Sequence, residues 1–189
     1  MPFIFSDDSF ISEGTSKLDD AGKFVDNVLE SDYQKYLQRK TKEGKVPKDR
    51  LEWEEARNYW LNDSPIARGN NFNKKAVTER WYPYDEIHLS NGKRLDSYDD
   101  VAGEIISRKA TDLNSIQLST FESYLKEMKS KYSPGTIIRS NKYPEIDGLE
   151  LTGKQILELP SSNQSLSNIQ EYIDLAMNKY GIELRFRGE

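Results

Sequence analysis

The feature that most constrains the fold is a two-residue turn, Asn91 and Gly92, which lies between two runs of alternating apolar and polar residues. The tightest β-hairpin turns need positive φ angles, which Asn and Gly tolerate better than other residues. A second, looser turn runs from Asp99 to Gly103. We therefore predict that residues 86–111 form three short strands in a β-meander, the element around which the rest of the chain is organised.

Alternation along the two strands of the hairpin predicts which side chains share a face. One face would carry Ile87, Leu89, Arg94, Asp96 and Tyr98, and the other Glu86, His88, Leu95 and Ser97. In the third strand Ser107 and Lys109 would share a face. Whether Asp96 meets the face of Lys109 depends on a strand register that the sequence leaves open.

The remaining elements follow from apolar periodicity and from breaker residues. Helices are predicted over residues 18–42, 48–61, 72–81, 115–131 and 166–180, and further strands over 136–139, 155–159 and 182–186. This order predicts an α+β fold in which a mixed β-sheet with a β-meander core is flanked by helices. Residues 1–64 would form an N-terminal arm and a helical hairpin whose aromatic side chains pack a core, and residues 65–189 an α/β domain.

The residue types present exclude several kinds of metal and catalytic site. The chain has no Cys and a single His, His88. Disulfides, thiolate ligands, Cys nucleophiles and multi-histidine zinc sites are therefore excluded. A metal would have to be held by carboxylates, backbone oxygens and water, a donor set that suits Mg²⁺ or Mn²⁺.

The formal net charge is −5, whereas binding to a phosphate backbone usually requires a basic surface. Such a surface could only be local. The candidates for nucleic-acid contacts all lie in the central part of the chain: Arg68, Lys74, Lys75, Lys93, Arg94 and Arg108. Arg68 lies in a polar run, residues 68–71, that either approaches a phosphate or is a plain loop between helices. No apolar run reaches the length of a membrane-spanning helix.

Four segments carry a resemblance to a known family: KRLDSYD, GEIISRKAT, YLKEMKSKYSPGTII and LTGKQILELP. Together they resemble the nuclease toxin domains at the C-termini of bacterial polymorphic toxins, which are grouped with the restriction-endonuclease-like, PD-(D/E)xK fold. The resemblance covers about residues 65–187. It implies a metal-dependent endonuclease that uses Mg²⁺ or Mn²⁺ and cleaves DNA in preference to RNA. It also implies a secreted or delivered effector that acts in the target-cell cytoplasm and is blocked by a cognate immunity protein.

The resemblance also implies roles for individual residues. Asp96 would hold the metal, and Lys109 would position or deprotonate the attacking water. The family pattern places Glu or Asp two residues before the Lys, but this chain has Ser107 there, which could orient water or bind the metal weakly. The candidates for the second carboxylate are Glu86, Glu104 and Glu158.

Two other functions remain open at this stage. If the site used no metal, His88 would become the expected general acid or base of a ribonuclease toxin. Alternatively, the acidic balance and the tyrosine-rich helices would suit a non-catalytic protein-binding module with an immunity or adaptor role.

Overall fold

A computed structural model describes residues 17–189 of the chain, and the arm predicted over residues 1–16 lies outside the described residues. The chain divides into two compact units between Tyr59 and Trp60. The division predicted from the sequence, at 64/65, lies a few residues further along. The two units are described in turn.

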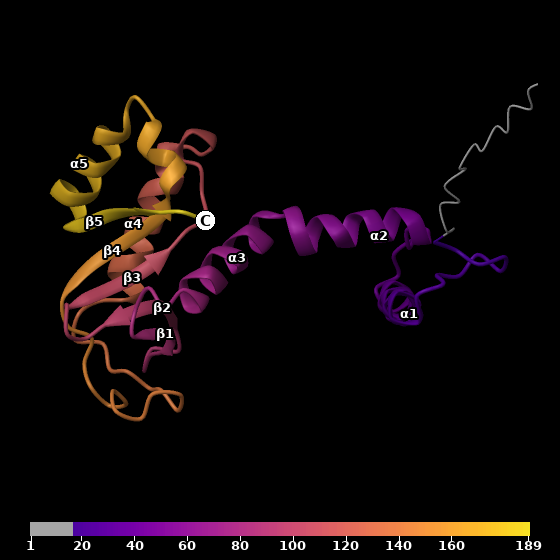
Figure 1. Ribbon diagram of the computed structural model, residues 1–189, viewed down its shortest axis with the longest axis horizontal. Coiled ribbons are helices and arrows are strands. Elements are labelled where there is room, and N and C mark those ends of the chain that lie inside the picture. The colour runs from indigo at the N-terminus through magenta and orange to yellow at the C-terminus, as the bar shows by residue number, and fades with distance from the viewer. Residues whose placement is uncertain (1–16) are drawn as a thin grey trace, which may run out of the picture. The chain divides into compact units, whose positions relative to one another are not determined.

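The first unit contains helices α1 (Asn27–Lys42) and α2 (Arg50–Asn58). Each begins at an Asp whose side chain accepts hydrogen bonds from amides of the first turn, as N-cap residues do. The predicted start of the first helix at Leu18 is wrong, because Leu18 pairs with Phe24 in an antiparallel bridge before the N-cap. In Figure 1, α1 is seen nearly end-on while α2 lies across the view, so the two helices cross instead of forming an antiparallel hairpin.

Most aromatic residues of this unit form its core, as predicted, but Tyr59 is exposed. Phe24, Tyr33, Tyr36 and Trp53 are all buried in one cluster. The ring centroids of Tyr33 and Trp53 are 5.2 Å apart. Both tyrosine hydroxyls are satisfied by the backbone of Lys48, since Tyr33 donates to its carbonyl and Tyr36 accepts from its amide. Aromatic pairs of this kind add to the stabilisation that comes from burial alone.

The second unit is built on one five-stranded sheet with the order β1-β2-β3-β4-β5, visible in Figure 1. The strands are β1 (Tyr84–His88), β2 (Arg94–Asp99), β3 (Glu104–Arg108), β4 (Lys154–Pro160) and β5 (Ile182–Arg187). The first three are antiparallel neighbours and form the predicted meander, whereas β4 and β5 run parallel to β3. The predicted α+β class with a mixed sheet flanked by helices is therefore confirmed.

The main helices of this unit are α3 (Pro65–Thr78), α4 (Leu118–Lys131) and α5 (Ile169–Tyr180). A π-helical turn (Tyr59–Asp63) precedes α3, and short 3-10 helices span Leu113–Ser115 and Ser161–Ser165. The third helix begins earlier than predicted, so residues 68–71 are helical and do not form a loop. Ser64 is its N-cap, accepting from the Ala67 amide at 3.1 Å, with Pro65 at the first helical position. The strand predicted at 136–139 is reduced to isolated bridges.

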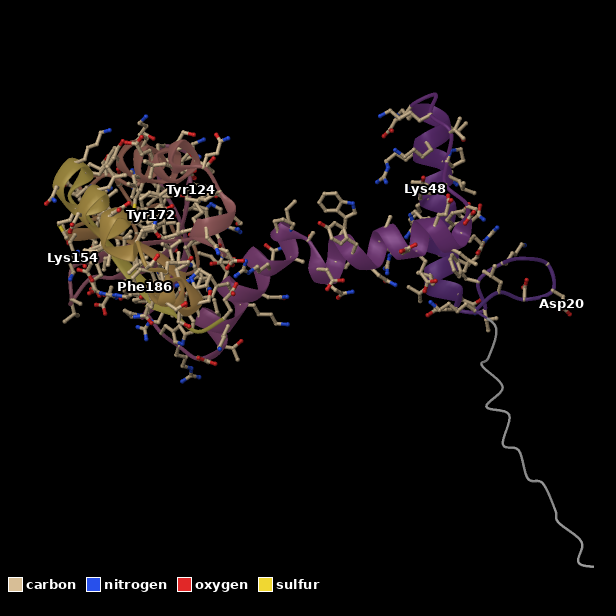
Figure 2. All side chains as sticks on the ribbon, turned by 90° about the horizontal axis from the view of Figure 1, so that it is seen from above. Asp20, Lys48, Tyr124, Lys154, Tyr172 and Phe186 are labelled. Carbon is tan, nitrogen blue, oxygen red and sulfur yellow. The ribbon has the colours of Figure 1, made fainter. Side chains whose placement is uncertain are left out.

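Different helices cover the two faces of the sheet. On one face, Ile105 and Leu157 pack in the large core with α4 and α5, which lie side by side through Phe121 and Tyr172 (Figure 2). On the other face Ile106 and Ile156 pack with residues 81 and 82. The 12 residues of α5 end at Gly181, whose φ of 66° is the left-handed conformation that Gly adopts most readily after a helix.

The sequence assigned Ile87 and Leu95 to opposite faces of the hairpin, and this assignment is wrong. Ile87 and Leu95 are cross-strand partners and both are fully buried in the large core. Glu86 has a φ of 55°, and this irregularity lies between the pairs Asp85–Ser97 and Ile87–Leu95. The hairpin loop has three residues, Ser90–Gly92, so that Leu95 and not Asp96 is the partner of Ile87. The alternation then shifts by one residue between Leu95 and Tyr98, at Asp96 opposite Glu86, while the register is the same on both sides of this position.

Candidate active site

Asp96 lies where the pairing between β2 and β3 ends. The last pair of that ladder is Ser97–Ile106. Beyond it, the Arg108 amide donates to the Asp96 carboxylate at 2.7 Å instead of to a backbone carbonyl. The other carboxylate oxygen accepts from Asn73 Nδ2 of α3 at 3.3 Å. A half-buried Asp in a strand is thus held between two layers of the unit by its own hydrogen bonds.

Ser107 lies next to this carboxylate, whereas the Lys109 side chain is held by α4. Ser107 Oγ is 3.5 Å from Asp96 Oδ2. The Lys109 ammonium points toward α4, 3.4 Å from Glu127 Oε1 and 5.3 Å from the Tyr124 ring centroid. The sequence left open whether Asp96 and Lys109 would meet: among the described residues the charge of Lys109 acts on the Asp96 carboxyl, but no hydrogen bond or ion pair joins the two side chains.

The titration of these groups reflects how close they are. Burial raises the pKa of the Asp96 carboxyl, while the Arg108 amide and the positive charges of Arg108 and Lys109 act in the opposite direction. Burial also acts to raise the pKa of Glu127, but the charges of Lys109 and Lys131 outweigh it, so that this pKa lies below its ordinary value. The Asp96 carboxyl is therefore protonated more readily than an ordinary Asp, and the Glu127 carboxyl less readily than an ordinary Glu.

Tyr132, at the end of α4, faces the same group of charges. Burial is the largest cause that raises the pKa of its hydroxyl to about 12, and the negative charges of Asp96 and Glu127 add to it. The hydroxyl donates to the Arg94 carbonyl at 3.0 Å, which ties α4 to β2. Gln155 of β4 donates to the carbonyls of Met128 and Tyr132 at 2.9 and 3.0 Å. These bonds fix the turn of α4 that carries Glu127.

A buried ion pair supports the site from the α3 side. Arg108 Nε donates to Glu158 Oε1 at 2.6 Å, and both side chains are almost completely excluded from solvent. The same guanidinium donates to Asn73 Oδ1 at 3.0 Å and to Ser97 Oγ at 3.1 Å. Asn73 therefore links Arg108 to Asp96. Tyr82 donates to the second oxygen of Glu158.

The structure does not bring the three proposed second carboxylates to Asp96. Glu158 is fully buried and neutralises Arg108. Glu104 lies at the opposite end of β3, where hydrogen bonds from Arg185 hold its pKa below the ordinary value. Glu86 is exposed, with Arg94 Nη1 at 3.7 Å from its carboxylate. Each of these acids lies beside a cation of its own, and among the described residues none of them has a contact with Asp96.

The residues predicted to contact nucleic acid are dispersed. Arg108 is buried, so it cannot reach a phosphate. Arg68 forms paired hydrogen bonds with Asp112 and with Glu189, and Lys75 donates to the Glu189 carbonyl. Lys74 and Lys93 are exposed, as is Arg94. Of the exposed members of the predicted set, Lys93 and Arg94 lie nearest to Asp96 along the chain.

The fit of a metal ion can be judged from the donors present. Within residues 17–189, no group of three or more His, Cys, Asp or Glu side chains could hold a metal ion. Mg²⁺ is often bound in a different way, by one or two carboxylates together with water and substrate phosphate. Asp96, which has one strong hydrogen bond and two long ones, and the Ser107 hydroxyl fit that kind of site.

Glu127 is the one acid beside Lys109 that the sequence analysis did not single out. It lies in the middle of an amphipathic helix, in the run Lys126-Glu127-Met128-Lys129, where an acid reads as part of a solvated face. The only sign in the sequence that Glu127 lies near the sheet was its position next to Met128, an apolar residue that is buried in the structure. Which strand that turn of α4 covers depends on tertiary packing that no local pattern encodes.

In comparisons with known proteins, no family model, no curated protein and no solved structure matches this chain. Over residues 17–189, no helix is both long enough and apolar enough to cross a membrane.

Proposed function

We propose that this chain is a metal-dependent nuclease of the restriction-endonuclease-like type, which hydrolyses phosphodiester bonds and acts as an interbacterial toxin. The observation that carries the proposal is the contact of Ser107 with Asp96 where β2 and β3 separate, with the Lys109 charge close enough to act on that carboxylate. The mixed sheet with its β-meander is the architecture that the resemblance implies. DNA as the preferred substrate, delivery into a target cell and a cognate immunity protein are supported by that resemblance alone.

The chemistry follows from the donors at the end of β3. Asp96 would hold Mg²⁺ or Mn²⁺, whose positive charge stabilises negative charge on the scissile phosphate. The Lys109 ammonium, held between Glu127 and the Tyr124 ring, would hydrogen-bond the attacking water and orient it. Glu127 keeps this ammonium in place and can supply a second carboxylate on the same side. Glu158 fixes the side chain of Arg108, and the Arg108 amide in turn holds the Asp96 carboxylate in position.

The proposal is tested by incubating the purified chain with plasmid DNA and with total RNA, each with and without EDTA. We expect DNA loss that EDTA abolishes. Asp96→Asn and Lys109→Ala should each lower the cleavage rate by about 100-fold or more, because both groups act on the reacting phosphate or water. Asp100→Asn and Lys42→Ala remove the same charges from exposed positions and should leave the rate unchanged.

Three results would contradict this proposal in different ways. Full activity of both Asp96→Asn and Lys109→Ala would exclude the site. RNA cleavage that resists EDTA and is lost in His88→Ala would favour the metal-independent ribonuclease, since His88 is exposed on β1. Absence of any cleavage, with the fold intact by circular dichroism, would favour the protein-binding module.

Glu127→Gln tests the residue that the structure adds to the site. The substitution keeps the size of the side chain but removes the charge that faces Lys109. We expect cleavage to fall by about tenfold, because the ammonium loses the anion that holds it in place, and its pH profile to change, because the Glu127 carboxyl no longer titrates. Glu122→Gln, one turn earlier on α4 and paired with Lys179, is the matched control. An unchanged rate and pH profile in Glu127→Gln would remove Glu127 from the site.

A further inference from the structure

A cavity of about 400 Å³ lies between the end of α3 and the start of β1, apart from the candidate active site. The residues that line it include Trp81, Tyr82, Tyr143 and Asp85. Ligand pockets commonly combine aromatic walls with a few placed polar groups. The proposed nuclease chemistry makes no use of this cavity.

Asp85 is an unusual residue to find at the wall of an aromatic cavity. It is 5% exposed, and burial raises the pKa of its carboxyl. Ser97 Oγ donates to its Oδ1 at 2.6 Å, the one hydrogen bond that the described residues give this carboxylate. Oδ2 is therefore left to accept from a ligand. A buried carboxylate with a single partner favours a ligand that brings hydrogen-bond donors.

The rim of the cavity carries the opposite charge. Arg80 is exposed and lines the cavity. Lys142 Nζ is 3.5 Å from the Asp85 carbonyl oxygen and 4.9 Å from the Tyr143 ring centroid, and its hydrogen bond with Tyr143 raises the pKa of its ammonium. These two cations would repel a positively charged ligand and attract a phosphate. The cavity therefore suits a ligand with donors at one end and negative charge at the other.

We propose that this cavity is a nucleobase subsite that accepts an unstacked guanine of the substrate strand through Asp85. The inference rests on the proposed nuclease function. Guanine presents two adjacent N–H donors on its Watson–Crick edge: Oδ2 of Asp85 can accept one, and Oδ1, which has a second lone pair beside the bond from Ser97, can accept the other. Adenine and cytosine present an acceptor beside their single amino donor, and uracil has two acceptors around one N–H, so each would place a lone pair against Asp85. Proteins read unstacked bases in this way, with aromatic side chains against the ring.

The subsite is also connected to the candidate active site through hydrogen bonds. Ser97 donates to Asp85 and accepts from Arg108 Nη2. Arg108 in turn donates through its amide to Asp96 and through its guanidinium to Asn73. A base bound at Asp85 would thus lie at the end of a chain of contacts that ends at the proposed catalytic carboxylate.

The test is isothermal titration of the full chain with 5′-GMP, 5′-AMP, 5′-CMP and 5′-UMP at one ionic strength. We expect 5′-GMP to bind at least tenfold more tightly than the other three. Asp85→Asn, which can still accept from Ser97, should lower 5′-GMP affinity at least tenfold. Val77→Trp fills the mouth of the cavity without touching the carboxylate and should do the same. Asp20→Asn removes an exposed charge in the first unit and serves as the control.

Equal affinity for the four nucleotides, or 5′-GMP binding that survives both Asp85→Asn and Val77→Trp, would overturn the subsite. Tighter binding of N-acetylarginine amide than of 5′-GMP would also overturn it, because the carboxylate would then serve a protein cation. The titration is independent of the cleavage assay. Selective 5′-GMP binding without cleavage overturns the nuclease alone, and cleavage without nucleotide selectivity overturns the subsite alone.

Discussion

At the scale of single residues, the role of an acid in a strand depends on whether a cation already neutralises it. Glu158 and Asp96 are both acids in strands, yet they differ in what neutralises them. Glu158 is fully buried opposite the equally buried Arg108 guanidinium. Asp96 faces an amide, an amide side chain and a hydroxyl, and none of these donors carries a full charge. Glu158 therefore acts in stability, whereas Asp96 retains lone pairs for a ligand.

Removing Glu158 should test that division. Glu158→Ala leaves the Arg108 charge buried without a counter-ion and takes away the acceptor of Tyr82. We expect the free energy of unfolding of the second unit to fall by about 3–5 kcal/mol, measured by denaturant titration. Glu183→Ala breaks a partly exposed ion pair on the neighbouring strand and should cost only about 0–1 kcal/mol. Similar losses in the two variants would show that the buried pair is not a stabilising element of the fold.

At the scale of elements, β3 and β4 begin beside each other because two glycine backbones touch. Gly153 has a φ of 111°, and a Cβ built on it would lie 2.0 Å from the Gly103 carbonyl oxygen. The Lys154 amide donates to that same carbonyl at 2.9 Å. The first parallel pair of the sheet thus depends on a position that no side chain can occupy.

Gly153→Ala should therefore destabilise the second unit by about 3 kcal/mol or more, since it combines a left-handed backbone with a clash against backbone atoms. Gly181→Ala shares the positive φ but meets open space, so it isolates the conformational cost, about 1–2 kcal/mol. Thermal unfolding of both variants measures the difference. Equal melting temperatures would mean that β4 shifts away from Gly103 at little cost.

The sequence predicted the elements that depend on local chemistry and missed those that depend on contacts. The class of the sheet and the Gly181 helix end follow from local backbone preferences, and the structure has both. The hairpin lies where Asn91 and Gly92 predicted it, but its loop has three residues, and Gly92 has positive φ while Asn91 does not. The positive φ of Glu86 has no local signal, because a charged non-glycine residue rarely adopts it. The proposed site was predicted only in part for the same reason: Asp96 lies on β2 and Lys109 directly follows β3, whereas Glu127 reaches Lys109 from a helix.

At the scale of the whole molecule, the two units use electrostatics differently. In the first unit a single ion pair dominates: Arg50 donates to Glu30 at 2.8 and 2.7 Å and lowers the pKa of Glu30 to about 2. The Phe24 amide donates to the same carboxylate. In the second unit Asp85 and Asp96 have raised pKa values, because burial outweighs their donors. Acid should therefore act on the units through different groups.

We expect the first unit to lose stability as the pH falls from about 4.5 toward 2. A carboxyl whose pKa is lower in the folded state stabilises that state above its ordinary pKa, and this contribution disappears as the group is protonated. The indole N–H signal of Trp53, buried in the first unit, follows the loss by NMR while the signal of Trp81 follows the second unit. Glu30→Gln should remove this acid dependence, and Glu55→Gln, an exposed glutamate of α2, should retain it. An unchanged slope in Glu30→Gln would assign the acid response to other groups.

The Arg108 amide donates to the side-chain carboxylate of Asp96, at a place where a neighbouring strand would normally offer a carbonyl. This amide has a use beyond catalysis. Its rate of hydrogen exchange and its chemical shift depend on a single acceptor atom. A cation that draws the Asp96 carboxylate toward itself would expose this proton to solvent while the rest of the sheet stays protected. One backbone cross-peak could thus serve as a titration indicator for occupancy of the centre, readable before any bond in a substrate is broken.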